Sequence, residues 1–316
     1  MAEHVTRLAP SPTGALHLGN ARTFLVNTLL ARQRGWRVLM RVEDLDTPRT
    51  KPGAAGHMLD ELAWLGLEWT GPIVRQTDRH AAYQQALRRL IDAGAAYPCT
   101  CSRKDIQLAA SAPHAEDATA AYPGTCRGRF ISAAEATART GRPAAWRVVV
   151  PDEPVAFVDE FAGPRQFDLT RTCGDFVVFR NEGTAAYQLA VVVDDAAAGV
   201  DAVVRGDDLL ESAARQIHLR RLLDLGPEPR YWHLPLVVGE DGRRLAKRHG
   251  DTRLSFYRAR GVRPERVLGL LGAWSGLLDR PRETSVAELL AAFDLARLPR
   301  SPVVFTARDN EFLLGG

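Results

Sequence analysis

The sequence contains no apolar run close to the roughly 20 residues that a membrane-spanning helix needs, and its N-terminus has no apolar stretch of the signal-peptide kind. We therefore expect a cytoplasmic protein without a membrane partner. The formal net charge is only +3, so the chain is not a polycation of the chromatin type, and a nucleic-acid partner must be argued from local features. The sequence also lacks an internal repeat.

Cysteine is scarce, because four cysteines in 316 residues cannot form a disulfide scaffold. Three of them lie close together with a tyrosine, in the arrangement C-x-C-x20-Y-x3-C: Cys99, Cys101, Tyr122 and Cys126. Three thiolates in one segment suit a tetrahedral zinc site, for which Tyr122 or His114 offers a fourth ligand. The alternative is a metal-free segment with buried thiols. No acidic residue adjoins the cluster as a base, so a structural role is expected for the zinc.

The remaining composition is that of a globular protein, with 46% hydrophobic and 25% charged residues and a length that suggests about two domains. Residues 5–9 are typical of a short strand and residues 10–14 of a turn-rich loop. The spacing of Ala21, Leu25 and Leu29 predicts an amphipathic helix, and residues 36–42 a second strand. This order is a βαβ unit, which predicts an α/β fold with a parallel sheet.

Further elements follow from the patterns beyond this unit. Residues 80–93 are typical of a helix, and residues 99–130 of an insertion. Ser285 is expected to begin a helix as its N-cap. The other expectations are strands at residues 146–150, 176–179, 187–193, 202–205 and 233–238, a helix at 209–225, a turn at 239–242, a basic loop at 243–250, and helices beyond 255.

Residues 10–20 combine a proline- and glycine-rich loop with the start of the first helix. The first N–H groups of a helix are unpaired, so such a loop is a ready phosphate site. His17 would lie at the helix entry, and Gly19 would let a nucleotide approach the backbone. The alternative is a turn with an incidental histidine.

Three segments together resemble class I aminoacyl-tRNA synthetases of the glutamyl branch. His17-Leu18-Gly19-Asn20 matches the "HIGH" signature, residues 41–49 are similar to the next motif of this branch, and residues 244–248 resemble the "KMSKS" signature with Lys247 as its second lysine. The resemblance implies a Rossmann-like parallel sheet with a zinc-bearing insertion and a C-terminal helical subdomain.

The resemblance also implies roles for individual residues. His17 and Lys247 would be catalytic, and would bind ATP together with Gly19 and Asn20, while Mg²⁺ would be held mainly through the ATP phosphates. The glutamate pocket would comprise Arg7, Leu8, Ala9, Pro10, Ser11, Glu43, Tyr187 and Arg205. The chemistry agrees, since Glu43 can pair with the substrate ammonium and Arg205 can bind the side-chain carboxylate in a bidentate way. Taken alone, Glu43 could equally be a solvated carboxylate and Tyr187 a core aromatic residue.

The chain ends too soon after Gly250 for an anticodon-binding domain, and with Tyr122 this shortness resembles the glutamyl-Q tRNA(Asp) synthetase family. That family implies activation of L-glutamate without tRNA, followed by transfer to queuosine in the anticodon loop of tRNA(Asp). The expected protein is a monomer. The alternatives are a truncated conventional synthetase, a cofactor nucleotidyltransferase and a silent tRNA-binding paralogue. The expected divisions are residues 1–98 and 186–250 for the two halves of the catalytic domain, 99–185 for the insertion, and 251–316 for the helical subdomain.

Overall fold

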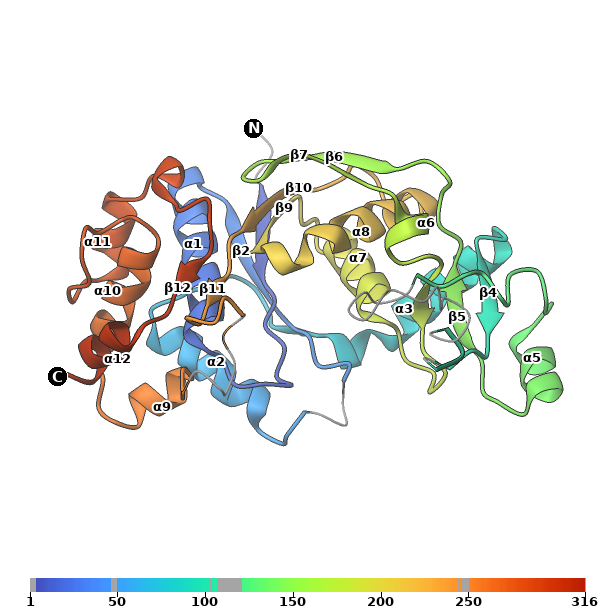
Figure 1. The fold of residues 1–316 in the computed structure, drawn as a ribbon, viewed down its shortest axis with the longest axis horizontal. Helices are drawn as coiled ribbons and strands as arrows, with labels where there is room; N and C mark the ends of the chain where they lie inside the picture. Colours follow the sequence, from blue (N-terminus) through green and yellow to red (C-terminus); the bar gives the residue numbers. More distant parts are fainter. Residues whose placement is uncertain are drawn as a thin grey trace.

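The computed structural model describes residues 4–46, 50–102, 104–106, 121–243, 245 and 250–315. Figure 1 shows the C-terminal helices at one end of the molecule and the small antiparallel sheet of the insertion at the other, with the parallel strands between them. The α/β class implied by the sequence is confirmed.

The N-terminal elements form the predicted βαβ unit. Strand β1 pairs with β2 in parallel, from Val5 opposite Arg37 to Leu8 opposite Met40, and β2 pairs in parallel with the short β3. The helix between β1 and β2 ends at Gly35, whose φ of 66° is the left-handed conformation that glycine adopts without strain. The elements are β1 (Val5–Leu8), α1 (Leu18–Arg34), β2 (Arg37–Val42), α2 (Ala54–Trp64) and β3 (Val74–Arg75).

A second parallel set continues the sheet beyond β1. Strand β10 lies between β9 and β6 and is parallel to both, while β7 closes the edge as an antiparallel hairpin with β6. The Asp201 N–H donates to the Val5 carbonyl over 3.1 Å, and β1 is in contact with β9, so the two sets lie edge to edge. The elements are β6 (Val155–Asp159), β7 (Gly163–Phe167), β9 (Ala202–Gly206) and β10 (Arg230–Leu234).

Helices pack beside the second set of parallel strands. One of them, α7, differs from the sequence prediction. Residues 187–193 were expected to form a strand, but they belong to helix α7, which packs against α3 and α8. A short apolar run is compatible with either a buried strand or a helix buried on most sides, so periodicity could not separate them. The elements are α3 (His80–Asp92), α7 (Tyr187–Ala197), η3 (Asp207–Leu209) and α8 (Leu210–Leu222).

The insertion is built on a three-stranded antiparallel sheet in the order β4-β5-β8. The hairpin β6–β7 also falls within residues 99–185, yet β6 is hydrogen-bonded to β10 of the second parallel set. The elements are β4 (Ala96–Cys99), α5 (Ala133–Thr140), β5 (Ala145–Val148), α6 (Leu169–Thr172) and β8 (Phe176–Phe179).

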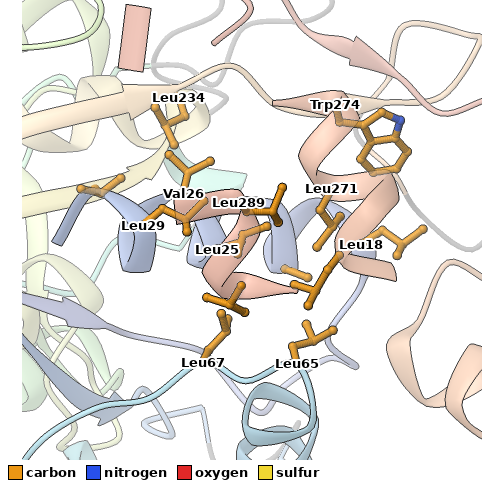
Figure 2. Close-up of a cluster of buried hydrophobic side chains, with 14 of the residues drawn as sticks. Leu18, Leu25, Val26, Leu29, Leu65, Leu67, Leu234, Leu271, Trp274 and Leu289 are labelled. Carbon is orange, nitrogen blue, oxygen red and sulfur yellow. The ribbon is translucent and has the colours of Figure 1, made fainter. Parts of the chain in front are cut away.

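The C-terminal helices share a hydrophobic core with α1. Leu25 and Leu29 of α1 belong to the same buried cluster as Leu271 and Leu289, and Leu25 lies next to Leu289 (Figure 2). Ser285 begins α11 with a capping box, as predicted. In the described part of the chain, none of the helices has the length and apolar character needed to cross a bilayer. The elements are β11 (Val237–Val238), α9 (Leu254–Arg258), α10 (Pro264–Trp274), α11 (Val286–Ala291), β12 (Val303–Val304) and α12 (Ala307–Leu314).

Candidate active site and metal centre

A cavity of about 500 Å³ opens where the carboxyl ends of β1, β2 and β9 meet the start of α1. Open α/β sheets bind ligands at this position, where neighbouring strands diverge in their connections. The wall includes the predicted residues Arg7, Ala9, Pro10, Ser11, His17, Gly19, Asn20, Glu43, Tyr187 and Arg205.

One side of the cavity carries a buried network of opposite charges. The Arg41 guanidinium donates one hydrogen bond to Asp195 and another, of 3.0 Å, to Glu43 Oε1. Arg7 lies in the same network, with Nε 3.4 Å from Asp195 Oδ1. Burial raises the pKa of Glu43, although Arg41 and Arg7 oppose the rise. Burial also acts to raise the pKa of Asp195, but Arg41 and Arg7 outweigh this effect and lower that pKa. Asp195 is therefore the ionised counterion of these two arginines.

Arg205 is held from three directions. Its Nε donates to His233 Nε2 over 2.9 Å, Nη1 donates to Gln216 Oε1 over 2.8 Å, and Nη2 donates to the Leu209 carbonyl over 3.3 Å. A guanidinium has five N–H donors, so one donor on each terminal nitrogen is left over from these bonds for a ligand. Tyr187, the first residue of α7, lines the same cavity. This geometry suits an acidic side chain, which can accept two parallel hydrogen bonds.

The other side of the cavity is formed by the N-terminus of α1. His17 is the N-cap residue, and Gly19 and Asn20 follow in the first turn, where backbone N–H groups have no acceptor within the helix and can bind an anion. A Cβ on Gly19 would lie 3.3 Å from the His17 ring, so glycine makes room for that ring. The Leu18 N–H donates to the Thr252 carbonyl over 3.0 Å, which fixes residues just after the basic loop against this helix start.

The structure brings together most, but not all, of the predicted site. Leu8 does not line the cavity, because its side chain is 0% exposed and packs in the core, so its place in the glutamate pocket stays a prediction. Lys247, Arg244 and the alternative zinc ligand His114 lie outside the described residues.

Two charged residues behind the cavity wall, Arg41 and Asp195, were given no role by the sequence. Arg41 and Glu43 share one face because residues i and i+2 along an extended chain point the same way. Asp195 carried a different signal, since an acidic pair at residues 194–195 interrupts an otherwise apolar stretch. A charge in such a stretch is rarely buried without a partner.

The three clustered cysteines meet at one point of the insertion. The sulfur atoms of Cys99, Cys101 and Cys126 all lie within 4.8 Å of one another, and Cys101 and Cys126 are 3.5 Å apart. The Tyr122 hydroxyl lies 3.4 Å from Cys99 Sγ and 3.8 Å from Cys101 Sγ. Gly174 allows this arrangement: its φ is +63°, and a Cβ there would lie 2.2 Å from the Tyr122 carbonyl oxygen.

This donor set has the spacing that a tetrahedral zinc ion requires. Thiolates bound at about 2.3 Å in a tetrahedron lie roughly 3.8 Å apart, close to the separations seen here. Burial, with Cys99 adding to it, raises the pKa of the Cys101 thiol to about 12. A thiol must lose its proton to ligate a metal, so metal binding here would release protons. The cluster can therefore hold a metal ion, with Tyr122 oxygen as the fourth donor.

Comparison with known proteins places these sites in context. Residues 3–305 match the family described as tRNA synthetases class I (E and Q), catalytic domain. The chain is 48% identical over 320 residues to a glutamyl-Q tRNA(Asp) synthetase from Symbiobacterium thermophilum, covering 98% of both chains. It is 49% identical over 309 residues to a protein of the same name from Nocardia farcinica, covering 97% of this chain and 94% of the relative.

Solved structures agree on the fold. A glutamate tRNA ligase from Elizabethkingia meningosepticum, in complex with its amino acid, superimposes with a TM-score of 0.82 at 25% identity. The match covers 99% of this chain and 69% of that structure. A glutamate-tRNA synthetase from Elizabethkingia anophelis superimposes with the same TM-score at 24% identity, covering 99% of this chain and 70% of that one.

Proposed function

Because this chain belongs to the class I tRNA synthetases, in the family of glutamyl-Q tRNA(Asp) synthetases, and is therefore a ligase-type enzyme, we propose that it activates L-glutamate with ATP in the absence of tRNA. The glutamate then goes to queuosine in the anticodon loop of tRNA(Asp). One observation carries the proposal: the groups suited to a doubly acidic amino acid line the same cavity as the first residues of α1, where a helix start suits a phosphate.

The first step needs no base from the enzyme. The substrate α-carboxylate is ionised at neutral pH, and its oxygen attacks the α-phosphorus of ATP while pyrophosphate leaves with the bridging electron pair. Glu43 binds the ammonium and Arg205 the side-chain carboxylate, which fixes the direction of attack. His17 and the N–H groups of Gly19 and Asn20 bind the phosphates. Lys247 is proposed to add a further positive charge for the phosphates, and Mg²⁺ would be bound through ATP.

In the second step, a hydroxyl of the cyclopentenediol of queuosine attacks the glutamyl carbonyl, and AMP leaves as the ester forms. The insertion is proposed to hold one structural zinc ion on Cys99, Cys101, Tyr122 and Cys126. These residues lie outside the set that lines the cavity, so the ion supports the fold and takes no part in either step. The active unit is proposed to be a monomer.

Glutamate-dependent exchange of pyrophosphate into ATP tests the activation step. We expect exchange without tRNA, and a rise of at least about 100-fold in the KM for glutamate in Arg205→Lys, because a lysine cannot make the bidentate contact. The matched control is Arg88→Lys, at an exposed arginine of α3, which leaves the exchange unchanged. Exchange that requires tRNA would contradict the proposal.

The acceptor is tested with labelled glutamate and tRNA(Asp) from which the 3′-terminal nucleotide has been removed. We expect full labelling of this tRNA, and none of a tRNA(Asp) that has its 3′ end but carries guanosine in place of queuosine. The opposite pattern would identify a conventional charging enzyme.

A further inference from the structure

His233 is a fully buried histidine that lies behind Arg205 and outside the residues lining the cavity. It stands opposite Arg205 in the parallel pairing of β9 with β10. Its Nδ1 is 2.6 Å from Asp159 Oδ2, and its Nε2 is 2.9 Å from Arg205 Nε. The side chains of His233 and Asp159 are both 0% exposed. The three residues therefore form a line that runs from β6 through β10 to β9.

The chemistry of the partners decides where the proton of His233 lies. A guanidinium donates hydrogen bonds and cannot accept them, so Nε2 must be the acceptor and the ring proton must be on Nδ1. Asp159 receives that proton as a hydrogen bond and is itself fixed by the N–H groups of Phe161 and Ala162, at 3.0 and 2.6 Å. Burial and the charge of Arg205 keep the pKa of His233 below its ordinary value, despite the nearby Asp159. A second proton on the ring would place two donors face to face.

A second chain of hydrogen bonds orients the other side of the guanidinium. Gln216 accepts from Arg205 Nη1 and donates to Gln188 Oε1 over 2.9 Å, and Gln188 donates to Ser212 Oγ over 3.0 Å. The Arg205 guanidinium also lies over the Tyr231 ring, 5.4 Å from its centroid. His233 accepts the hydrogen bond from Arg205 Nε. Nε joins the guanidinium plane to the rest of the side chain, so this bond limits the rotation of that plane.

We propose that His233 is a positioning residue for substrate selection: held by Asp159 as the neutral Nδ1–H tautomer, it presents an acceptor to Arg205 and so aims the two remaining N–H donors at the substrate side-chain carboxylate. This inference rests on the proposed function, since it takes glutamate as the ligand of Arg205. It adds that glutamate selectivity depends on a residue that does not touch glutamate.

The test compares two substitutions that separate the two ring nitrogens. In His233→Asn the amide can still donate to Asp159 but is too short to reach Arg205, whereas in His233→Gln the side-chain oxygen can take the place of Nε2. We expect His233→Asn to raise the KM for glutamate about 10-fold or more in the exchange reaction, since a hydrogen bond to a charged group is lost. The KM for ATP should stay within twofold, and His233→Gln should recover most of the loss.

The control is His218→Asn, at another buried histidine, whose Nε2 contacts the Val149 carbonyl at 2.7 Å. It should leave the KM for glutamate unchanged. The inference is overturned if His233→Asn keeps the wild-type KM for glutamate, or if both KM values and the unfolding midpoint change together, as a purely structural role requires. Arg205→Lys separates the two hypotheses: if that variant raises the KM for glutamate and His233→Asn does not, only the inference fails. If neither does, the assigned glutamate pocket fails.

Discussion

The cavity and the cysteine cluster are both buried sites that crowd reactive groups, yet they balance charge in different ways. Arg7 and Arg205 line the cavity and Arg41 lies behind it, and the protein matches all three with Glu43, Asp195 and neutral acceptors. In the cluster, three thiols and a phenol face one another, and the cation that contacts them is Arg147, whose Nε lies 3.3 Å from Cys99 Sγ. The cavity is therefore pre-organised by its own side chains, whereas the zinc ion proposed for the cluster would have to come from solution.

The largest effect is expected from a substitution that disturbs the charge balance of the cavity. Glu43→Gln removes the proposed partner of the substrate ammonium and leaves Arg41 with one carboxylate fewer. Breaking a buried pair costs about 3–5 kcal/mol, so kcat/KM for glutamate should fall by at least about 100-fold. Steady-state exchange kinetics measure this. Glu68→Gln is the control, because the Glu68 side chain is 83% exposed in its pair with Arg32. Equal losses in both variants would refute a specific role for Glu43.

Removal of the proposed zinc ion tests the cysteine cluster. With free zinc at 100 to 1,000 times its Kd, chelation should lower the free energy of unfolding by about 3–4 kcal/mol, because the ion stabilises the folded state that binds it. Elemental analysis of Cys126→Ser should find no bound zinc, while the glutamate-dependent exchange of pyrophosphate into ATP should persist. Cys173→Ser, at a cysteine outside the cluster, should retain the metal. A Cys126→Ser protein that keeps a full zinc equivalent would show that the cluster is not the site.

A glycine substitution should disturb the backbone beside the cysteine cluster without removing any of the proposed zinc ligands. Gly174→Ala combines a φ of +63° with a close approach to the Tyr122 carbonyl, so it should cost about 2 kcal/mol in urea unfolding and weaken zinc binding. Gly183→Ala has a φ of +85° but no atom within 4 Å of the added Cβ, so it should cost about 1 kcal/mol and leave zinc affinity unchanged. Similar zinc affinities in the two variants would contradict the steric explanation.

The smallest effect is a pH dependence of the cavity. Burial raises the pKa of Glu43 above the ordinary 4.5, and the substrate ammonium favours the ionised form. As the pH falls through this raised pKa, Glu43 becomes protonated and the KM for glutamate should rise by up to about tenfold per pH unit. Glutamate binding should accordingly release protons in this range, which calorimetry in buffers of different ionisation enthalpy can measure. Proton uptake would have the wrong sign.

The sequence predicted the parts of the site that depend on local pattern. The loop of residues 10–14 followed by helical spacing located His17 at the helix start, and the cysteine spacing located the cluster. It could not predict that His233 meets Arg205 and Asp159, because those contacts join residues 28 and 74 positions apart through strand register. The helix at residues 187–197 was mistaken for a strand because its apolar run has no periodicity that separates the two, and Asp195 was missed with it.

The core that α1 shares with the C-terminal helices (Figure 2) limits how far this enzyme can be truncated. Leu271 and Leu289 lie in the same buried cluster as Leu25 and Leu29 of α1, the helix whose N-cap residue is His17. A stepwise deletion from the C-terminus should therefore lose ATP binding as soon as it uncovers Leu25 and Leu29, well before the cut reaches any residue of the cavity. The C-terminal helices therefore stabilise the helix whose start is the proposed phosphate site, and we expect a minimal active fragment to include them.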